Sequence, residues 1–185
     1  MYFLFLILIA LFLISILSTN WPVKVYHHFL LTKIAQIFNA VPERKGLIFS
    51  NVYSQINLIY HERQIRIRFM EASVDSLRAN SGLEIRTKIA TQVVMEFYRF
   101  DRSKREWGDF KRFTTNDLQL DSEWFILTND LTSSREFWDS FKLRQLLSEK
   151  ALKQLLINRE EIICQLSTHS PERVKNFIDL LIQAV

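Results

Sequence analysis

The chain has 185 residues, 48% of them hydrophobic, and a formal net charge of +4 at neutral pH. This length suits one domain of ordinary size with its own core, and so small a charge excess argues by itself for neither nucleic acid nor an anionic surface. The single cysteine, Cys164, excludes an intrachain disulfide scaffold. The three glycines lack the spacing of a phosphate-binding loop, which disfavours nucleotide chemistry of that kind.

The first 18 residues (MYFLFLILIALFLISILS) contain no charged side chain and are almost wholly Leu, Ile and Phe. A helix that crosses a bilayer needs about 20 such residues, so residues 1–21 predict a transmembrane anchor. A cleaved secretory signal and a buried core helix are the alternatives, and the signal would want a basic leader that this chain lacks. Four basic residues follow the run and predict that the body of a single-pass membrane protein faces the cytoplasm: Lys24, Lys33, Arg44 and Lys45.

Residues 22–41 predict an amphipathic connecting helix. Tyr26, Leu30, Ile34 and Phe38 recur at helical spacing within about 23–39, while most of the polar residues fall elsewhere. Such a helix packs on the domain that follows or lies in a lipid interface.

Residues 42–185 predict a single α+β domain. After a break at Pro42, apolar and polar residues alternate with the period of strands. Strands are expected at about 46–53, 56–61, 64–71, 83–90, 92–99, 123–128 and 161–166, with the sixth central in the sheet. Helices are expected from Ser133, whose capping box ends at Glu136, at about 149–157, and from Pro171. The fold class is therefore α+β: an N-terminal transmembrane helix, then one domain with a mainly antiparallel sheet covered by C-terminal helices.

Two segments carry a resemblance to a known group: the hairpin IYHERQIRIRF (Ile59 to Phe69) and the run LQLDSEWFILTND (Leu118 to Asp130). With the preceding span and amphipathic helix, their order resembles a loose group of bacterial, membrane-anchored proteins of unknown function. The resemblance implies an anchored α+β domain and supplies no catalytic residues.

Basic residues gather on two predicted strands and in the polar loop that follows them. On the strands they alternate with apolar residues, which directs them to one face of a sheet. Such a face suits anionic lipid or a protein partner, and single-stranded nucleic acid is less favoured; the plain alternative is a solvated face with cross-strand ion pairs. The candidate binding residues are Arg66, Arg68, Arg86, Lys88, Arg102, Lys104, Arg105 and Trp107.

Four carboxylates flank the predicted strand at 123–128. Paired carboxylates divide acid and base roles when their surroundings separate their pKa values, but Asp is also common at strand ends because it accepts hydrogen bonds from the local backbone. The carboxylates are Asp117, Asp121, Glu123 and Asp130.

Other chemistry is poorly supported. His27 and His28 are adjacent, so on a helix they point about 100° apart and do not easily share a metal ion. Cys164 alternates with Ile162 on an apolar face, which predicts a buried, inert thiol. We expect no metal and no cofactor.

The sequence thus predicts a membrane-anchored, non-catalytic binding or scaffold domain. Its partners would be the membrane, through the N-terminal span, and an anionic lipid or a protein. The alternative is a membrane-tethered hydrolase that uses the carboxylates from Asp117 to Asp130.

Overall fold

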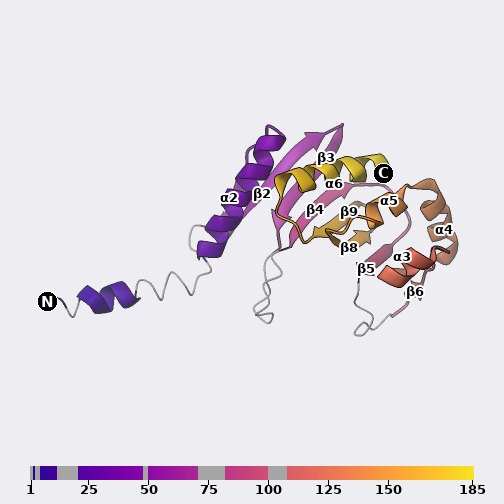
Figure 1. The fold of residues 1–185 in the computed structure, drawn as a ribbon, viewed down its shortest axis with the longest axis horizontal. Coiled ribbons are helices and arrows are strands. Elements are labelled where there is room, and N and C mark those ends of the chain that lie inside the picture. Colours follow the sequence, from indigo (N-terminus) through magenta and orange to yellow (C-terminus); the bar gives the residue numbers. More distant parts are fainter. Residues whose placement is uncertain (1, 3–4, 12–20, 48–49, 71–81, 100–107) are drawn as a thin grey trace.

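The structure is a computed structural model that describes residues 2, 5–11, 21–47, 50–70, 82–99 and 108–185 (Figure 1). Its centre is a nine-stranded sheet in the order β1-β2-β3-β4-β9-β8-β5-β7-β6, in which every neighbouring pair is antiparallel. The strands are β1 (Glu43–Leu47), β2 (Ser50–Tyr60), β3 (Arg63–Phe69), β4 (Leu83–Lys88), β5 (Met95–Arg99), β6 (Lys111–Arg112), β7 (Trp124–Thr128), β8 (Leu152–Ile157) and β9 (Glu161–Leu166).

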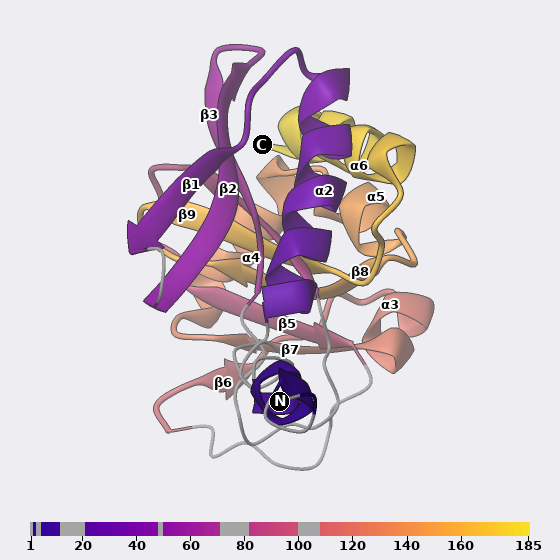
Figure 2. The same ribbon diagram turned by 90° about the vertical axis from the view of Figure 1, so that its left-hand side faces the viewer.

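Helices cover one face of this sheet. They are α2 (Trp21–Ile37), α3 (Leu118–Glu123), α4 (Leu131–Ser140), α5 (Leu143–Leu147) and α6 (Pro171–Ala184). Figure 2 shows α2, α5 and α6 on the same side of the strands. Leu31 and Ile34 of α2, Leu146 of α5, and Phe177 and Ile178 of α6 share one buried core with the sheet. This face is apolar because each of its strands directs every second side chain towards the helices.

The predicted N-terminal transmembrane helix is wrong. Among the described residues, no helix is long and apolar enough to cross a membrane. Helical residues 5–11 make about two turns, and α2 contains Lys24 and Lys33 and buries one side against the sheet instead of lipid. The prediction of a single-pass membrane protein is therefore wrong as well. The predictions that this span attaches the protein to a membrane, and that the domain lies on its cytoplasmic side, depended on the same helix and are wrong with it. The predicted span also covers residues 1, 3–4 and 12–20, which lie outside the described residues.

The expected hairpin is confirmed. β2 and β3 pair in a register that sets Tyr60 opposite Arg63, so His61 and Glu62 form a two-residue loop. Both loop residues have positive φ, 47° and 65°, the backbone sign that a tight type I′ hairpin turn requires. The separate strands predicted at 46–53 and 56–61 are instead β1 and the long β2, joined by their own antiparallel pairing.

In the second half of the domain, the structure differs from prediction at residues 149–157 and at the cap of α4. Residues 149–157 were expected to be helical, but Leu152–Ile157 form β8 between β5 and β9. Pairing on both edges outweighs the helical spacing of the leucines. The predicted capping box is also wrong, because α4 is capped by Asp130, whose carboxylate accepts from the backbone N–H of Thr132 and from the Ser133 hydroxyl.

Strand β7 is buried along its whole length but is not central. It lies second from one edge, between β5 and the short β6. Its apolar residues on both faces have a different cause: Trp124 and Ile126 join the main core, and Phe125 and Leu127 form a smaller cluster with Tyr98 on the opposite face.

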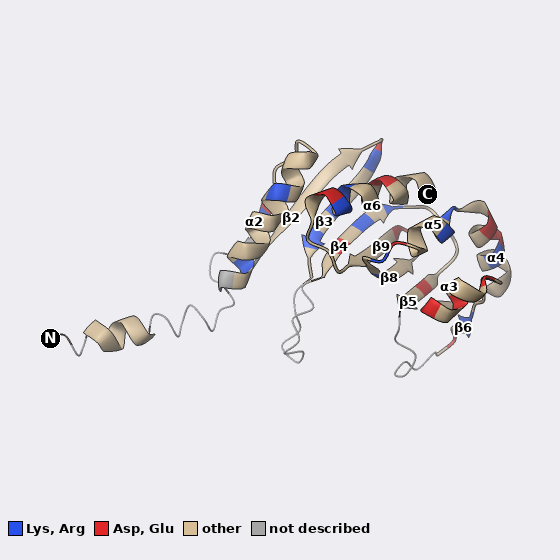
Figure 3. Ribbon diagram, in the orientation of Figure 1, with Lys and Arg blue, Asp and Glu red and all other residues tan. Residues whose placement is uncertain are grey.

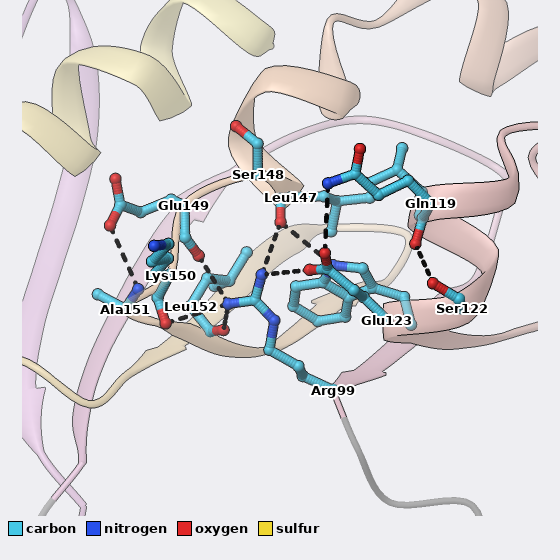
Figure 4. Close-up of polar contacts among 12 residues, drawn as sticks. Arg99, Gln119, Ser122, Glu123, Leu147, Ser148, Glu149, Lys150, Ala151 and Leu152 are labelled. Atoms are coloured by element: carbon cyan, nitrogen blue, oxygen red, sulfur yellow. Dashed lines mark hydrogen bonds and ion pairs between the residues drawn. The ribbon is translucent and has the colours of Figure 1, made fainter.

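A buried arginine, Arg99 at the end of β5, ties the β5, α3 and α5 regions together (Figure 4). Its side chain is 5% exposed, and its guanidinium lies 4.9 Å from the Trp124 ring. Nη2 donates to the Glu123 carboxylate at 3.0 Å. The same guanidinium donates to four backbone carbonyls around the end of α5 and the start of β8, those of Leu147, Glu149, Lys150 and Leu152.

Candidate functional site

The sheet face opposite the helices, here called the open face, carries the predicted basic residues of β3 and β4. Figure 3 shows Lys and Arg along these neighbouring strands. Strand register sorts their side chains into cross-strand rows: Arg68 lies opposite Glu84, and Arg66 lies opposite Arg86. The same rows continue to Gln55 and Asn57 on β2 and to Gln165 and Ile163 on β9. The alternation read from the sequence therefore brings Arg66, Arg68, Arg86 and Lys88 to one face.

Glu84 holds two arginines in place: Arg68, which lies opposite it in the cross-strand row, and Arg86 of its own strand. Its side chain is 7% exposed, and its Oε1 lies 2.6 Å from Nε of both Arg68 and Arg86. Arg86 adds a second contact, from Nη2 to Oε2 at 3.2 Å. Burial opposes ionisation of Glu84, but the hydrogen bonds from Arg86 and Arg68 outweigh it and hold the pKa of the carboxyl below its usual value. This row is internally neutralised and fixes the position of Arg86.

A groove of about 400 Å³ lies beside this network, across β2, β3, β4 and β9. Strands are spaced about 4.8 Å apart, so the groove spans roughly 14 Å, the length of about four residues of extended chain. Its wall combines cations, amides, one carboxylate and apolar side chains. The lining residues are Asn57, Leu58, Ile59, Gln64, Ile65, Arg66, Arg86, Thr87, Lys88 and Glu161.

The three cations that line the groove, Arg66, Arg86 and Lys88, differ in whether a carboxylate neutralises them. Arg86 is neutralised by Glu84 and, through Nη1, by Glu161 at 3.0 Å. Arg66 and Lys88 are exposed, and within the described part of the chain neither forms an ion pair. Arg66 also lies directly opposite Arg86, and it is the member of this cross-strand pair that has no carboxylate partner among the described residues. The geometry thus provides a place for an acidic group.

The other predicted binding residues cannot be placed beside this groove. Arg102, Lys104, Arg105 and Trp107 lie outside the described residues. Sequence reasoning missed Asn57, Gln64 and Glu161, which complete the groove. The signal that could have found them is strand position: Gln64 lies on β3 itself, and Asn57 and Glu161 lie on the strands next to β3 and β4. All three alternate with core residues and so face away from the core.

The four candidate catalytic carboxylates all have structural partners. Asp117 caps α3 and pairs with Arg144, and the hydrogen bonds from Arg144 hold the pKa of this carboxyl below its usual value. Asp130 caps α4, and its pKa is lowered chiefly by the hydrogen bond from Ser133. Glu123 accepts from Arg99. Each serves the local backbone or an arginine, so no observation favours a hydrolase here.

Asp121 supplies a test of this structural role. Its Oδ1 accepts from the backbone N–H of Thr115 at 2.8 Å and from the Thr115 hydroxyl at 2.9 Å. Replacing Asp121 by Ala is expected to lower the free energy of unfolding by about 1–2 kcal/mol, because two hydrogen bonds are lost. Urea denaturation measures this. Asp139→Ala, at an exposed position of α4, is the matched control and should change stability by less than about 0.5 kcal/mol.

Histidines and the cysteine have packing roles. The rings of His27 and Phe69 are stacked at 4.1 Å, and His28 Nδ1 lies 2.8 Å from the Ser54 hydroxyl. Cys164 is fully buried, as predicted, and burial raises the pKa of its thiol. Over the described ranges, no three His, Cys, Asp or Glu side chains are grouped so as to hold a metal ion.

Comparison with known proteins gives similarity at the level of fold. No protein-family model matches the chain, and no curated protein matches it. The crystal structure of the mycobacterial trehalose monomycolate transport factor A, TtfA, is similar, with a TM-score of 0.57 and 12% sequence identity over 83% of this chain and 93% of that one. At this identity the likeness shows that the two chains share a fold.

Proposed function

We propose that this protein is a non-catalytic binding domain whose open-face groove holds an acidic segment of a partner protein. The observation that carries the proposal is the opposed pair Arg66 and Arg86, in a groove where Arg66 and Lys88 have no ion-pair partner among the described residues. Charge-assisted hydrogen bonds from guanidinium to carboxylate are the strong polar contacts that such a site offers.

The lining of the groove favours a protein segment. The Gln64 side-chain amide can bond an extended main chain, and so can the Asn57 amide oxygen, whereas Nδ2 of Asn57 already donates to the Glu43 carboxylate at 2.8 Å. Ile59, which is 75% exposed, offers an apolar contact. None of the described residues that line the groove is aromatic, whereas single-stranded nucleic acid needs aromatic platforms for its bases. Two cations without an ion-pair partner in the described part of the chain suit one or two acidic side chains better than a polyanionic surface. The shared fold with a protein described as a transport factor is compatible with such a role.

The proposal is tested with the full chain and a fluorescein-labelled peptide of about eight residues that alternates Glu with Leu, by fluorescence anisotropy. Arg66→Gln and Lys88→Gln are each expected to weaken binding about fivefold to tenfold, because each removes one cation from the groove. Arg173→Gln removes the same charge from an exposed position on α6, on the helix-covered side, and should change binding by less than about twofold.

Two results would contradict the proposal. One is equal loss in the Arg66 and Arg173 variants, which would indicate attraction by net charge alone. The other is binding of anionic lipid vesicles that depends on Arg66 and Lys88 while the peptide does not bind, which would assign the groove to a lipid headgroup. A peptide with Gln in place of Glu controls for apolar binding.

A further inference from the structure

Two carboxylates hold Arg86, and they differ in burial. Glu84 is 7% exposed and contacts Nε at 2.6 Å and Nη2 at 3.2 Å. Glu161 is 31% exposed and contacts only Nη1, at 3.0 Å. Glu84 therefore makes the more buried and more numerous contacts with the guanidinium, while Glu161 is the carboxylate partner of Arg86 that lines the groove.

The Glu161 carboxylate can move away from Arg86 while its backbone stays in place. Its backbone is fixed at the start of β9, since its N–H donates to the Asn158 side chain at 2.8 Å. Its carboxylate has Arg86 as its partner among the described residues. Lys88 lies directly across the β4–β9 ladder from Glu161 and also lines the groove. A carboxylate displaced from Arg86 thus has a second cation one strand away.

We infer that Glu161 is an internal competitor in the groove, whose carboxylate occupies on Arg86 the position that an acidic group of the partner segment takes when it binds. The inference rests on the proposed binding function and adds its regulation. An incoming carboxylate bridges Arg66 and Arg86, and the displaced Glu161 then competes with the partner segment for Lys88. The affinity of the site is set by the difference in free energy between the two arrangements. Any partner carboxylate that contacts Arg86 at this position must displace Glu161, so Glu161 lowers the affinity of the groove for acidic segments.

The test compares Glu161→Gln with Glu160→Gln in the same anisotropy experiment, at one ionic strength. Both variants lose one negative charge at adjacent positions, but Glu160 is exposed and does not line the groove. Glu161→Gln is expected to bind the Glu/Leu peptide about threefold to tenfold more tightly than wild type. Glu160→Gln is expected to stay within about twofold of wild type. Urea denaturation of Glu161→Gln should give a midpoint close to that of wild type, because Glu84 still holds Arg86.

The possible outcomes show whether the binding function and the competitor role stand or fall together. Binding by wild type with no difference between the Glu161 and Glu160 variants overturns the competitor role and leaves the binding function standing. Binding by Glu161→Gln but not by wild type supports both. Absence of binding in wild type and in both variants overturns the binding function, and the competitor role with it. Introducing Arg66→Gln into Glu161→Gln should remove most of the gain, because Arg66 supplies the other half of the bridge.

Discussion

Replacing Arg99 by Met is expected to lower the free energy of unfolding by about 3–5 kcal/mol, because it deletes a buried cation and leaves its partners unsatisfied. Methionine fills a similar volume without donors. The Glu123 carboxylate then loses its arginine, and the backbone carbonyls that Arg99 joins around the end of α5 and the start of β8 lose their shared donor. The contact with the Trp124 ring is lost as well.

Guanidinium chloride denaturation measures this effect. Arg99→Lys keeps the charge and one donor group, so it should recover part of the loss but not the several simultaneous carbonyl contacts. Trp124→Phe, which removes one hydrogen bond to the Leu147 carbonyl, should cost less than Arg99→Met. A loss below about 1 kcal/mol in Arg99→Met would show that the carbonyls find other donors.

Replacing Glu84 by Gln is expected to lower the free energy of unfolding at pH 7 by about 2–3 kcal/mol, since Arg68 and Arg86 then share a neutral partner on a partly buried surface. The pKa of Glu84 in the folded protein lies below its ordinary value of 4.5. The ionised carboxylate therefore stabilises the fold fully above that ordinary value, and the contribution disappears as the pH falls through the lower folded-state pKa.

The measurement is the denaturation midpoint of wild type and Glu84→Gln from pH 7 down into the acid range. The difference between the two proteins should be largest at neutral pH and shrink as Glu84 becomes protonated in wild type. Glu136→Gln, at an exposed position of α4, should show almost no difference at any pH. A Glu84→Gln deficit that stays constant down to acid pH would mean that replacing an acceptor oxygen by an NH2 group beside two arginines, and not the loss of charge, causes it.

Local patterns predicted much of the fold. Alternation along β3, β4 and β9 placed Ile65, Ile85 and Cys164 in the core, where the structure finds them. Pro171 predicted the start of the last helix, and in α6 the structure buries Val174 and Phe177 in the core. The same alternation predicted that Arg66 and Arg86 share a face. These features follow from side-chain periods of two and of about 3.6, which each segment carries by itself.

Other features depend on contacts between distant residues. Spacing of leucines predicted a helix at 149–157, but β5 and β9 make this segment a strand. The apolar N-terminal run predicted a membrane span, and no described helix has the length and apolarity to form one. For residues 149–157, composition described the segment correctly as apolar, while pairing with β5 and β9 decided its structure.

The sequence by itself determined which residues alternate between core and surface, where the hairpin turns, and which strands carry arginine, because these depend on neighbours along the chain. Only the tertiary structure decided that Glu161 meets Arg86 and that Glu84 holds two arginines in place. It also decided that Arg99 joins the end of α5 to the sheet. Strand order and register set these pairings, and they arise only when segments separated by up to about half the chain settle in one sheet.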